Sequence, residues 1–156
     1  MKYARLTKEQ FEELHLEFAN FLATQSIDKN EWEFLKNNQP AVAEQELDVF
    51  SDLIWEGVLS NAKYLEHYSK NHIFLFYCND DHIDSMVLKS LVPEVNLVTN
   101  EGFQWLSENI FSDKVEILNG KKSLEKNRNE AIFDLIRQGA VLSNGELYNQ
   151  IMTIMR

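Results

Sequence analysis

The sequence predicts an α/β protein in which an N-terminal helical layer is followed by a small, mainly parallel three-stranded sheet covered by C-terminal helices. Helical spacing of apolar residues fills the first 68 positions, whereas from His72 short apolar runs alternate with helical patterns. This order is typical of parallel strands joined by right-handed crossovers. The 156 residues suffice for one core, so we expect a single domain with a helical part, 1–68, and an α/β part, 69–156.

Three helices are expected in the helical part. The first begins at Thr7, where a capping pattern precedes an apolar stripe of Phe11, Leu14, Phe18, Phe21 and Leu22. A short second helix begins at Asp28 and ends before Pro40. Pro40 suits the first turn of a third helix that runs to about Ser60.

The α/β part is expected to begin with a central strand at Ile73 to Cys78, which is apolar and aromatic throughout. A helix capped by Asp81 is expected to follow and to carry Ile83, Val87, Leu88 and Leu91. We then expect a strand at Val95–Val98, a helix with Phe103, Leu106 and Ile110, and a strand at Val115–Leu118. The expected elements end with a helix from about Ser123 to Gly139 and a last helix from Ser143.

The chain is strongly acidic, with 15 Lys and Arg against 25 Asp and Glu and a net charge of −10. Such a field repels phosphates, so direct nucleic acid binding is not expected, and a basic protein or protein complex is the better candidate partner. Cys78 is the single cysteine, which excludes an intrachain disulfide and any zinc site that needs several thiolates. Without a signal-peptide pattern or a long apolar run, we expect a cytoplasmic protein.

Four acidic residues at four-residue spacing predict a charged stripe on one face of the third helix: Glu44, Asp48, Asp52 and Glu56. Like charges four residues apart repel each other, at a total cost of about 1 kcal/mol. No Lys or Arg between Pro40 and Ala62 offsets this repulsion locally. Trp55 and Leu59 lie in the same sector, so the face resembles a protein-binding patch with an apolar centre and a charged rim.

Two interpretations of this acidic stripe remain open. The carboxylates attract a basic partner, which would make the chain a non-enzymatic adaptor or regulator. Alternatively, they face solvent while Trp55 and Leu59 pack beneath another element of the chain. A metal site is a weaker third alternative, because metal-binding bundle helices usually supply Glu-x-x-His and no His lies between Gln39 and Glu66.

A second candidate site follows the first predicted strand, in the stretch Asp80–Asp84. Open parallel sheets bind ligands at the carboxyl ends of their strands, where polar residues of all three strands would meet. Aspartate or histidine could then act as acid, base or ligand, with lysine available to an anionic substrate, which gives an enzyme or small-ligand-binding protein as the alternative function. Acids at a helix start also stabilise its dipole without any chemistry. The candidate residues are Asp80, Asp81, His82, Glu101 and Lys121.

No catalytic or cofactor motif accompanies either site. The sequence contains neither a glycine-rich phosphate loop nor a Gly-x-Ser-x-Gly elbow, and no cofactor is expected. His15, His67 and His72 lack a ligand-like spacing, so no metal is expected either. The adaptor is therefore the leading hypothesis and the enzyme the alternative.

The chain resembles a family of short acidic proteins from Bacteroidota without a characterised activity, in the stretches "KYARLTKEQFEELHLEFANFLATQSI", "ELDVFSDLIWEGVL" and "YLEHYS". The resemblance is clearest over the first 70 residues. Some members carry the name histidyl-tRNA synthetase, but this chain is too short for that catalytic domain and lacks its arginine- and glycine-bearing motifs. The resemblance implies a lineage, and it assigns no functional residue to this chain.

Overall fold

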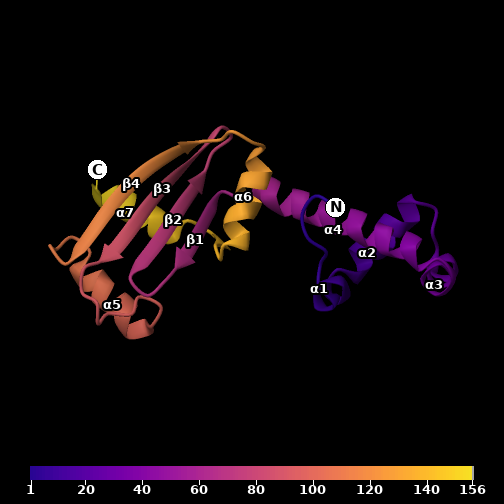
Figure 1. Cartoon of the computed structure of the whole chain (residues 1–156), viewed down its shortest axis with the longest axis horizontal. Coiled ribbons are helices and arrows are strands. Elements are labelled where there is room, and N and C mark those ends of the chain that lie inside the picture. Colours follow the sequence, from indigo (N-terminus) through magenta and orange to yellow (C-terminus); the bar gives the residue numbers. More distant parts are fainter. Residues whose placement is uncertain (156) are drawn as a thin grey trace. The chain divides into compact units, whose positions relative to one another are not determined.

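The computed structural model describes residues 1–155, which form seven helices and one five-stranded sheet (Figure 1). The chain divides into two compact units, Met1–Ser60 and a second unit that begins at Asn61. The first unit is helical, whereas the second contains the sheet and three helices. Each helix of the described residues is too short or too polar to cross a membrane.

The helices of the first unit are α1 (Lys8–Glu13), α2 (His15–Thr24), α3 (Lys29–Asn38) and α4, which spans Pro40–Asn61 and so ends one residue inside the second unit. The predicted starts are confirmed, since the side chain of Thr7 caps α1 and the side chain of Asp28 caps α3. The predicted first helix is divided, because Leu14 leaves the helical conformation and separates α1 from α2.

Aromatic side chains form the core of the first unit. The ring of Phe50, on α4, lies 5.0 Å from Phe18, 5.5 Å from Phe21 and 5.9 Å from Phe11, measured between ring centroids. Trp32 of α3 meets Phe18 edge to face at 5.2 Å. Rings at these separations attract one another beyond the area that they bury, so the apolar stripe of α1 and α2 fixes their position on α4.

The sheet of the second unit is antiparallel throughout, with the strand order β4-β3-β2-β1-β5. Its strands are β1 (Tyr64–Tyr68), β2 (His72–Cys78), β3 (His82–Ser90), β4 (Val115–Ser123) and β5 (Val141–Ser143). β2 is the central strand, as predicted.

The prediction of a mainly parallel three-stranded sheet was wrong. The segment expected as a helix after Asp81 is strand β3, which the short turn 79–81 joins to β2 as a hairpin. A connection this short permits antiparallel pairing alone, whereas parallel pairing needs a crossover. Val95–Val98 forms turns and not a strand, and the short strands β1 and β5 were missed.

The remaining helices are α5 (Asn100–Asn109), α6 (Arg128–Arg137) and α7 (Glu146–Met155). α5 and α7 cover one face of the sheet, where their buried side chains join those of β2 and β3 in the main core: Ile73, Leu75, Met86, Leu88, Leu106 and Ile151. α6 packs against one end of the opposite face (Figure 1). Because side chains alternate along a strand, residues of the main core alternate along β2 and β3 with residues that face α6.

Candidate functional site

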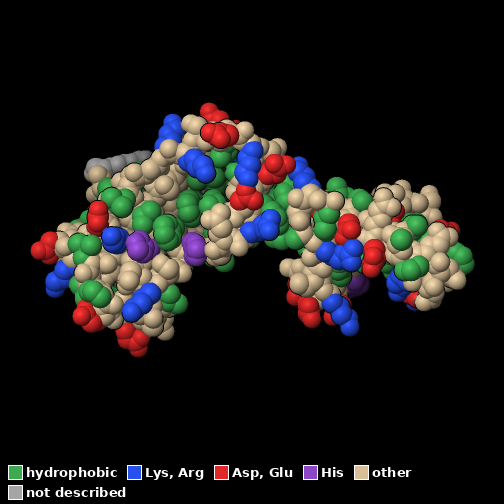
Figure 2. Space-filling view, in the orientation of Figure 1, with side chains coloured by type: hydrophobic (Ala, Val, Ile, Leu, Met, Phe, Trp, Pro, Cys, Tyr) green, Lys and Arg blue, Asp and Glu red, His purple; other side chains and the backbone are tan. Residues whose placement is uncertain are grey.

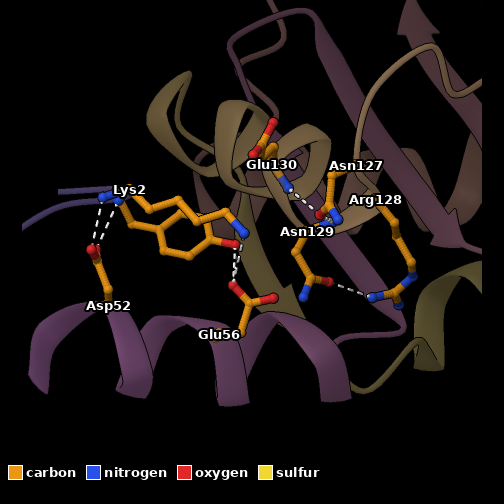
Figure 3. A network of polar contacts seen from close by, with 8 residues as sticks. Lys2, Asp52, Glu56, Asn127, Arg128, Asn129 and Glu130 are labelled. Carbon is orange, nitrogen blue, oxygen red and sulfur yellow. Dashed lines mark hydrogen bonds and ion pairs between the residues drawn. The ribbon is translucent and has the colours of Figure 1, made fainter. Parts of the chain in front are cut away.

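The acidic stripe of α4 binds the chain's own N-terminal segment, residues 2–6, inside the first unit (Figure 3). The two carboxylate oxygens of Asp52 accept the backbone N–H groups of Lys2, at 2.7 Å, and Tyr3, at 2.9 Å. Glu56 accepts the hydroxyl of Tyr3 and pairs with the ammonium of Lys2 at 3.4 Å. Asp52 and Glu56 therefore hold an extended segment of basic and aromatic residues.

The same segment engages the preceding turns of α4. The guanidinium of Arg5 donates to Asp48 at 2.7 Å, and this hydrogen bond lowers the pKa of the Asp48 carboxyl. The N–H of Leu6 donates to the buried hydroxyl of Ser51 at 3.0 Å. Asp48 and Ser51 thus continue the row of contacts, and Leu6 itself is buried.

The N-terminal segment supplies the hydrogen-bond donors and basic side chains for the row of like charges, which has no basic residue nearby in the sequence. Three of the four stripe carboxylates accept hydrogen bonds from residues 2–5, while Glu44 acts on Arg5 through its charge alone. Leu59, expected beside the acids, is fully buried and belongs to no exposed patch, and Trp55 is half-buried. The docking of a basic protein on this face stays a prediction.

The second predicted site lies in and beside the turn between β2 and β3. His82 Nδ1 lies 2.6 Å from a carboxylate oxygen of Asp81, and its Nε2 lies 3.4 Å from one of Asp84. The bond to His82 lowers the pKa of Asp81, with a smaller contribution from the charge of Lys121. The structure therefore brings together Asp81, His82 and Lys121, and it adds Asp84, the register partner of Lys121.

The other predicted members do not join this cluster. Asp80 is exposed in the turn. Glu101 belongs to the first turn of α5. The nearby Leu97 donates its N–H to the carbonyl oxygen of Lys70, which precedes β2. Asp81, in contrast, follows β2. The two groups therefore lie toward opposite ends of β2. A parallel sheet would have brought them to one edge, and the antiparallel sheet separates them.

A pocket of about 610 Å³ opens between α6 and the sheet, and we call it the α6 pocket. Its apolar walls come from both elements and from the loop that joins β4 to α6: Phe76, Ile83, Leu124, Ala131 and Leu135. Figure 2 shows hydrophobic side chains at the surface beside α6, with basic and acidic side chains next to them. This volume lies within the range of pockets that hold small molecules, about 300–1,000 Å³.

Six polar residues complete the lining of the α6 pocket: Ser85, Lys122, Glu125, Lys126, Asp134 and Gln138. The ammonium of Lys126 pairs with Asp134, so these two charges offset each other. Among the described side chains, neither Ser85 Oγ nor Lys122 Nζ has a hydrogen-bond or ion-pair partner. A ligand therefore meets apolar side chains together with the hydroxyl of Ser85, the ammonium of Lys122, the carboxylate of Glu125 and the amide of Gln138.

Hydrogen bonds fix the start of α6 within the second unit. The side chain of Asn127 caps the helix by accepting the N–H groups of Asn129, at 2.9 Å, and Glu130, at 3.4 Å (Figure 3). Arg128 donates to the carbonyl oxygens of Ala62 and Asn79, which lie beside β1 and β2. These bonds hold one wall of the α6 pocket in place against the other.

The pocket residues were missed because β3 was interpreted as a helix. Ile83, Val87 and Leu88 fit a helical face, but they fit a strand equally well. The signal for the hairpin was the polar Asn79–Asp81 stretch between two apolar runs. In a strand, Ile83 shares a face with Ser85, and Lys122 is the register partner of Ile83.

Within residues 1–155, no group of His, Cys, Asp and Glu side chains could hold a metal ion. The search of curated proteins and the search of solved structures each found no match to the chain. A family model does match, over residues 1–156. The chain thus belongs to the family of unknown function DUF6495.

Proposed function

We propose that this protein binds a small molecule in the α6 pocket. The observation that carries the proposal is the pocket itself, about 610 Å³ in volume, in which apolar side chains of the sheet and of α6 combine with six polar residues. Pockets of this volume are common sites of small-molecule binding. The site borders the Asp80–Asp84 stretch through Ile83, but it opens on the face opposite to His82 and Asp84.

The walls of the pocket support binding because they are built from regular elements. Phe76, Ile83 and Ser85 lie on the paired strands β2 and β3, while Ala131 and Leu135 lie on α6. The cap at Asn127 and the bonds of Arg128 hold this helix. A site whose walls are ordered before binding loses less conformational freedom on binding than a site on mobile loops.

Calorimetric titration with two eight-carbon probes, octan-1-ol and octanoate, tests the proposal. We expect saturable binding at one site of the wild type and loss of binding in Ala131→Phe, whose added ring fills the pocket. Ala41→Phe is the matched control, because Ala41 is an exposed residue of α4 in the first unit. Circular dichroism and thermal unfolding establish that both variants are folded.

Either of two results would reject the small-molecule proposal. One is the absence of saturable binding to the wild type. The other is binding that persists unchanged in the folded Ala131→Phe variant, which would place the probes elsewhere. Leu135→Trp fills the same pocket from the next turn of α6 and serves if Ala131→Phe does not fold.

A test of the adaptor hypothesis has to leave the N-terminal segment bound to α4. Neutralising all four stripe acids would release the N-terminal segment, because Asp48, Asp52 and Glu56 bind it. Glu44→Gln alone removes a stripe charge while leaving those hydrogen bonds in place. We therefore propose that a basic partner, if it docks on α4, loses affinity in Glu44→Gln, measured by salt-dependent binding to a lysine-rich peptide.

A further inference from the structure

We infer that the ligand of the α6 pocket is an amphipathic anion, whose carboxylate or phosphate group binds Lys122 and Ser85. This inference rests on the proposed function and adds the chemical class of the ligand. Its basis is the position of two polar groups without a described partner, the ammonium of Lys122 and the hydroxyl of Ser85, on the sheet side of the pocket, which also has apolar walls.

The register of the sheet brings the two groups together. Lys122 is the cross-strand partner of Ile83, and Ser85 is the partner of Gly120, two residues along each strand. Ser85 and Lys122 are therefore diagonal neighbours on one face, where long side chains reach across the ~7–8 Å between backbone positions. One anionic group can contact the ammonium and the hydroxyl at the same time.

Gly120 keeps the space over Ser85 open. A Cβ added at Gly120 would lie 2.9 Å from Ser85 Oγ, closer than such contacts normally are. Any larger residue would have to displace the hydroxyl or occupy the place where a head group would bind. The glycine thus leaves the hydroxyl accessible from the pocket.

The four charged residues of the pocket have a net charge of zero, so the position of Lys122, and not the total charge, favours an anion. Lys126 and Asp134 neutralise each other as an ion pair. Glu125 is exposed and lies two residues before Asn127, the cap of α6, where the amide dipoles of the helix stabilise a negative charge. Lys122 is left as the cation available to a ligand. The apolar walls, in particular Phe76 and Leu135, then take the rest of the molecule.

The test compares four eight-carbon probes that differ at one end: octanoate, octyl phosphate, octan-1-ol and octylammonium. Calorimetry on the full-length wild type should give each anion an affinity at least about tenfold above that of octanol, since a charge-assisted contact is stronger than a neutral one. Lys122→Gln should reduce the affinity for the anions to that for octanol and leave octanol unchanged. Either order of the two anions supports the inference.

Lys121→Gln is the matched control, because Lys121 is the neighbouring residue of β4 and, as the register partner of Asp84, lies on the opposite face. It should leave all four affinities unchanged. Gly120→Ala should weaken the anions and spare octanol, since its methyl group displaces the Ser85 hydroxyl. Both Lys122 and Lys121 are exposed, so neither substitution removes a buried contact.

The outcomes separate this inference from the proposed function. Equal affinities for octanol and the anions, or anion binding that is unaffected by Lys122→Gln, would overturn the inference while leaving a small-molecule site intact. Tighter binding of octylammonium than of the anions would overturn it in favour of a cation at Glu125. If no probe binds, the inference and the proposed function both fail.

Discussion

Cys78 shows how burial controls the chemistry of a single residue. Its side chain is buried on β2, and burial raises the pKa of the thiol to about 11, against an ordinary value of 9.0. The thiolate is the reactive form, so we expect the raised pKa to slow the reaction of the folded protein with thiol reagents at pH 8.

Labelling with a thiol reagent, with and without denaturant, measures this difference. We expect slow labelling of the folded protein that accelerates as the pH rises toward 11, and rapid labelling after unfolding. Labelling of the folded protein at the unfolded rate would show that Cys78 is accessible and would contradict its placement in the sheet.

Gly102 is required by close packing in α5. A Cβ at this position would collide with the carbonyl group of Asn96, and the N–H of Gly102 donates to the side chain of Thr99, which caps the helix. We expect Gly102→Ala to lower the free energy of unfolding by about 1–3 kcal/mol or more, as overpacking does. Chemical denaturation measures the change.

Gly57→Ala is the control for that substitution. Gly57 lies within α4, and outside its chain neighbours and the adjacent helix backbone no atom of the described residues comes within 4 Å of an added Cβ. The exchange should stabilise the protein by about 0.5–1 kcal/mol, because alanine loses less conformational entropy in a helix. A destabilisation by Gly57→Ala equal to that of Gly102→Ala would show that the loss does not come from the contact with Asn96.

At the scale of elements, we expect Asp52 to contribute strongly to the contact between the N-terminal segment and α4. Its carboxylate accepts two backbone N–H groups, whereas the ion pairs of Lys2 and Arg5 are partly exposed and contribute little each. Asp52→Asn replaces one acceptor oxygen with an amide donor. We expect faster hydrogen exchange at residues 2–6 in this variant, measured by mass spectrometry.

Glu44→Gln supplies the comparison, because Glu44 belongs to the same stripe but accepts no hydrogen bond from the segment among the contacts described. Exchange at residues 2–6 should stay close to that of the wild type. Equal acceleration in both variants would mean that the total charge of α4, and not the bonds of Asp52, holds the segment.

The elements also show how far the sequence could predict the fold. Capping residues and apolar spacing located α3, α4, β2 and β4, because these signals are local. The same spacing misled at β3, where Ile83, Val87 and Leu88 suit a helix as well as a strand. The hydrogen-bonded partners decide between the two, and they come from β2 and β4, distant in sequence.

The candidate sites were likewise predictable where they depend on residues close in sequence, and not where they depend on distant ones. The acidic stripe was visible in the sequence, but its counterpart was not, because Lys2 and Arg5 reach α4 across more than 40 residues of chain. Asp81, His82 and Lys121 were predicted together and do lie near one another. Ser85 and Leu135 could not be predicted, since the α6 pocket depends on the pairing of β3 and on the position of α6.

For the whole molecule, ligand binding in the α6 pocket should raise stability. A ligand that binds the folded state alone stabilises it by about 2.7 kcal/mol at one hundred times its dissociation constant. The effect would be greatest for the second unit, which contains every residue that lines the pocket. A bound ligand should therefore lie on the α6 side of the sheet.

Intermolecular NMR contacts between octanoate and methyl-labelled protein test that location most directly. We predict contacts from the octanoate chain to the methyl groups of Ile83, Leu124 and Leu135, which line the pocket. We predict none to Ile117 and Leu106, which belong to the core on the opposite face. Contacts at Ile117 or Leu106 without any at Ile83 or Leu135 would contradict the account.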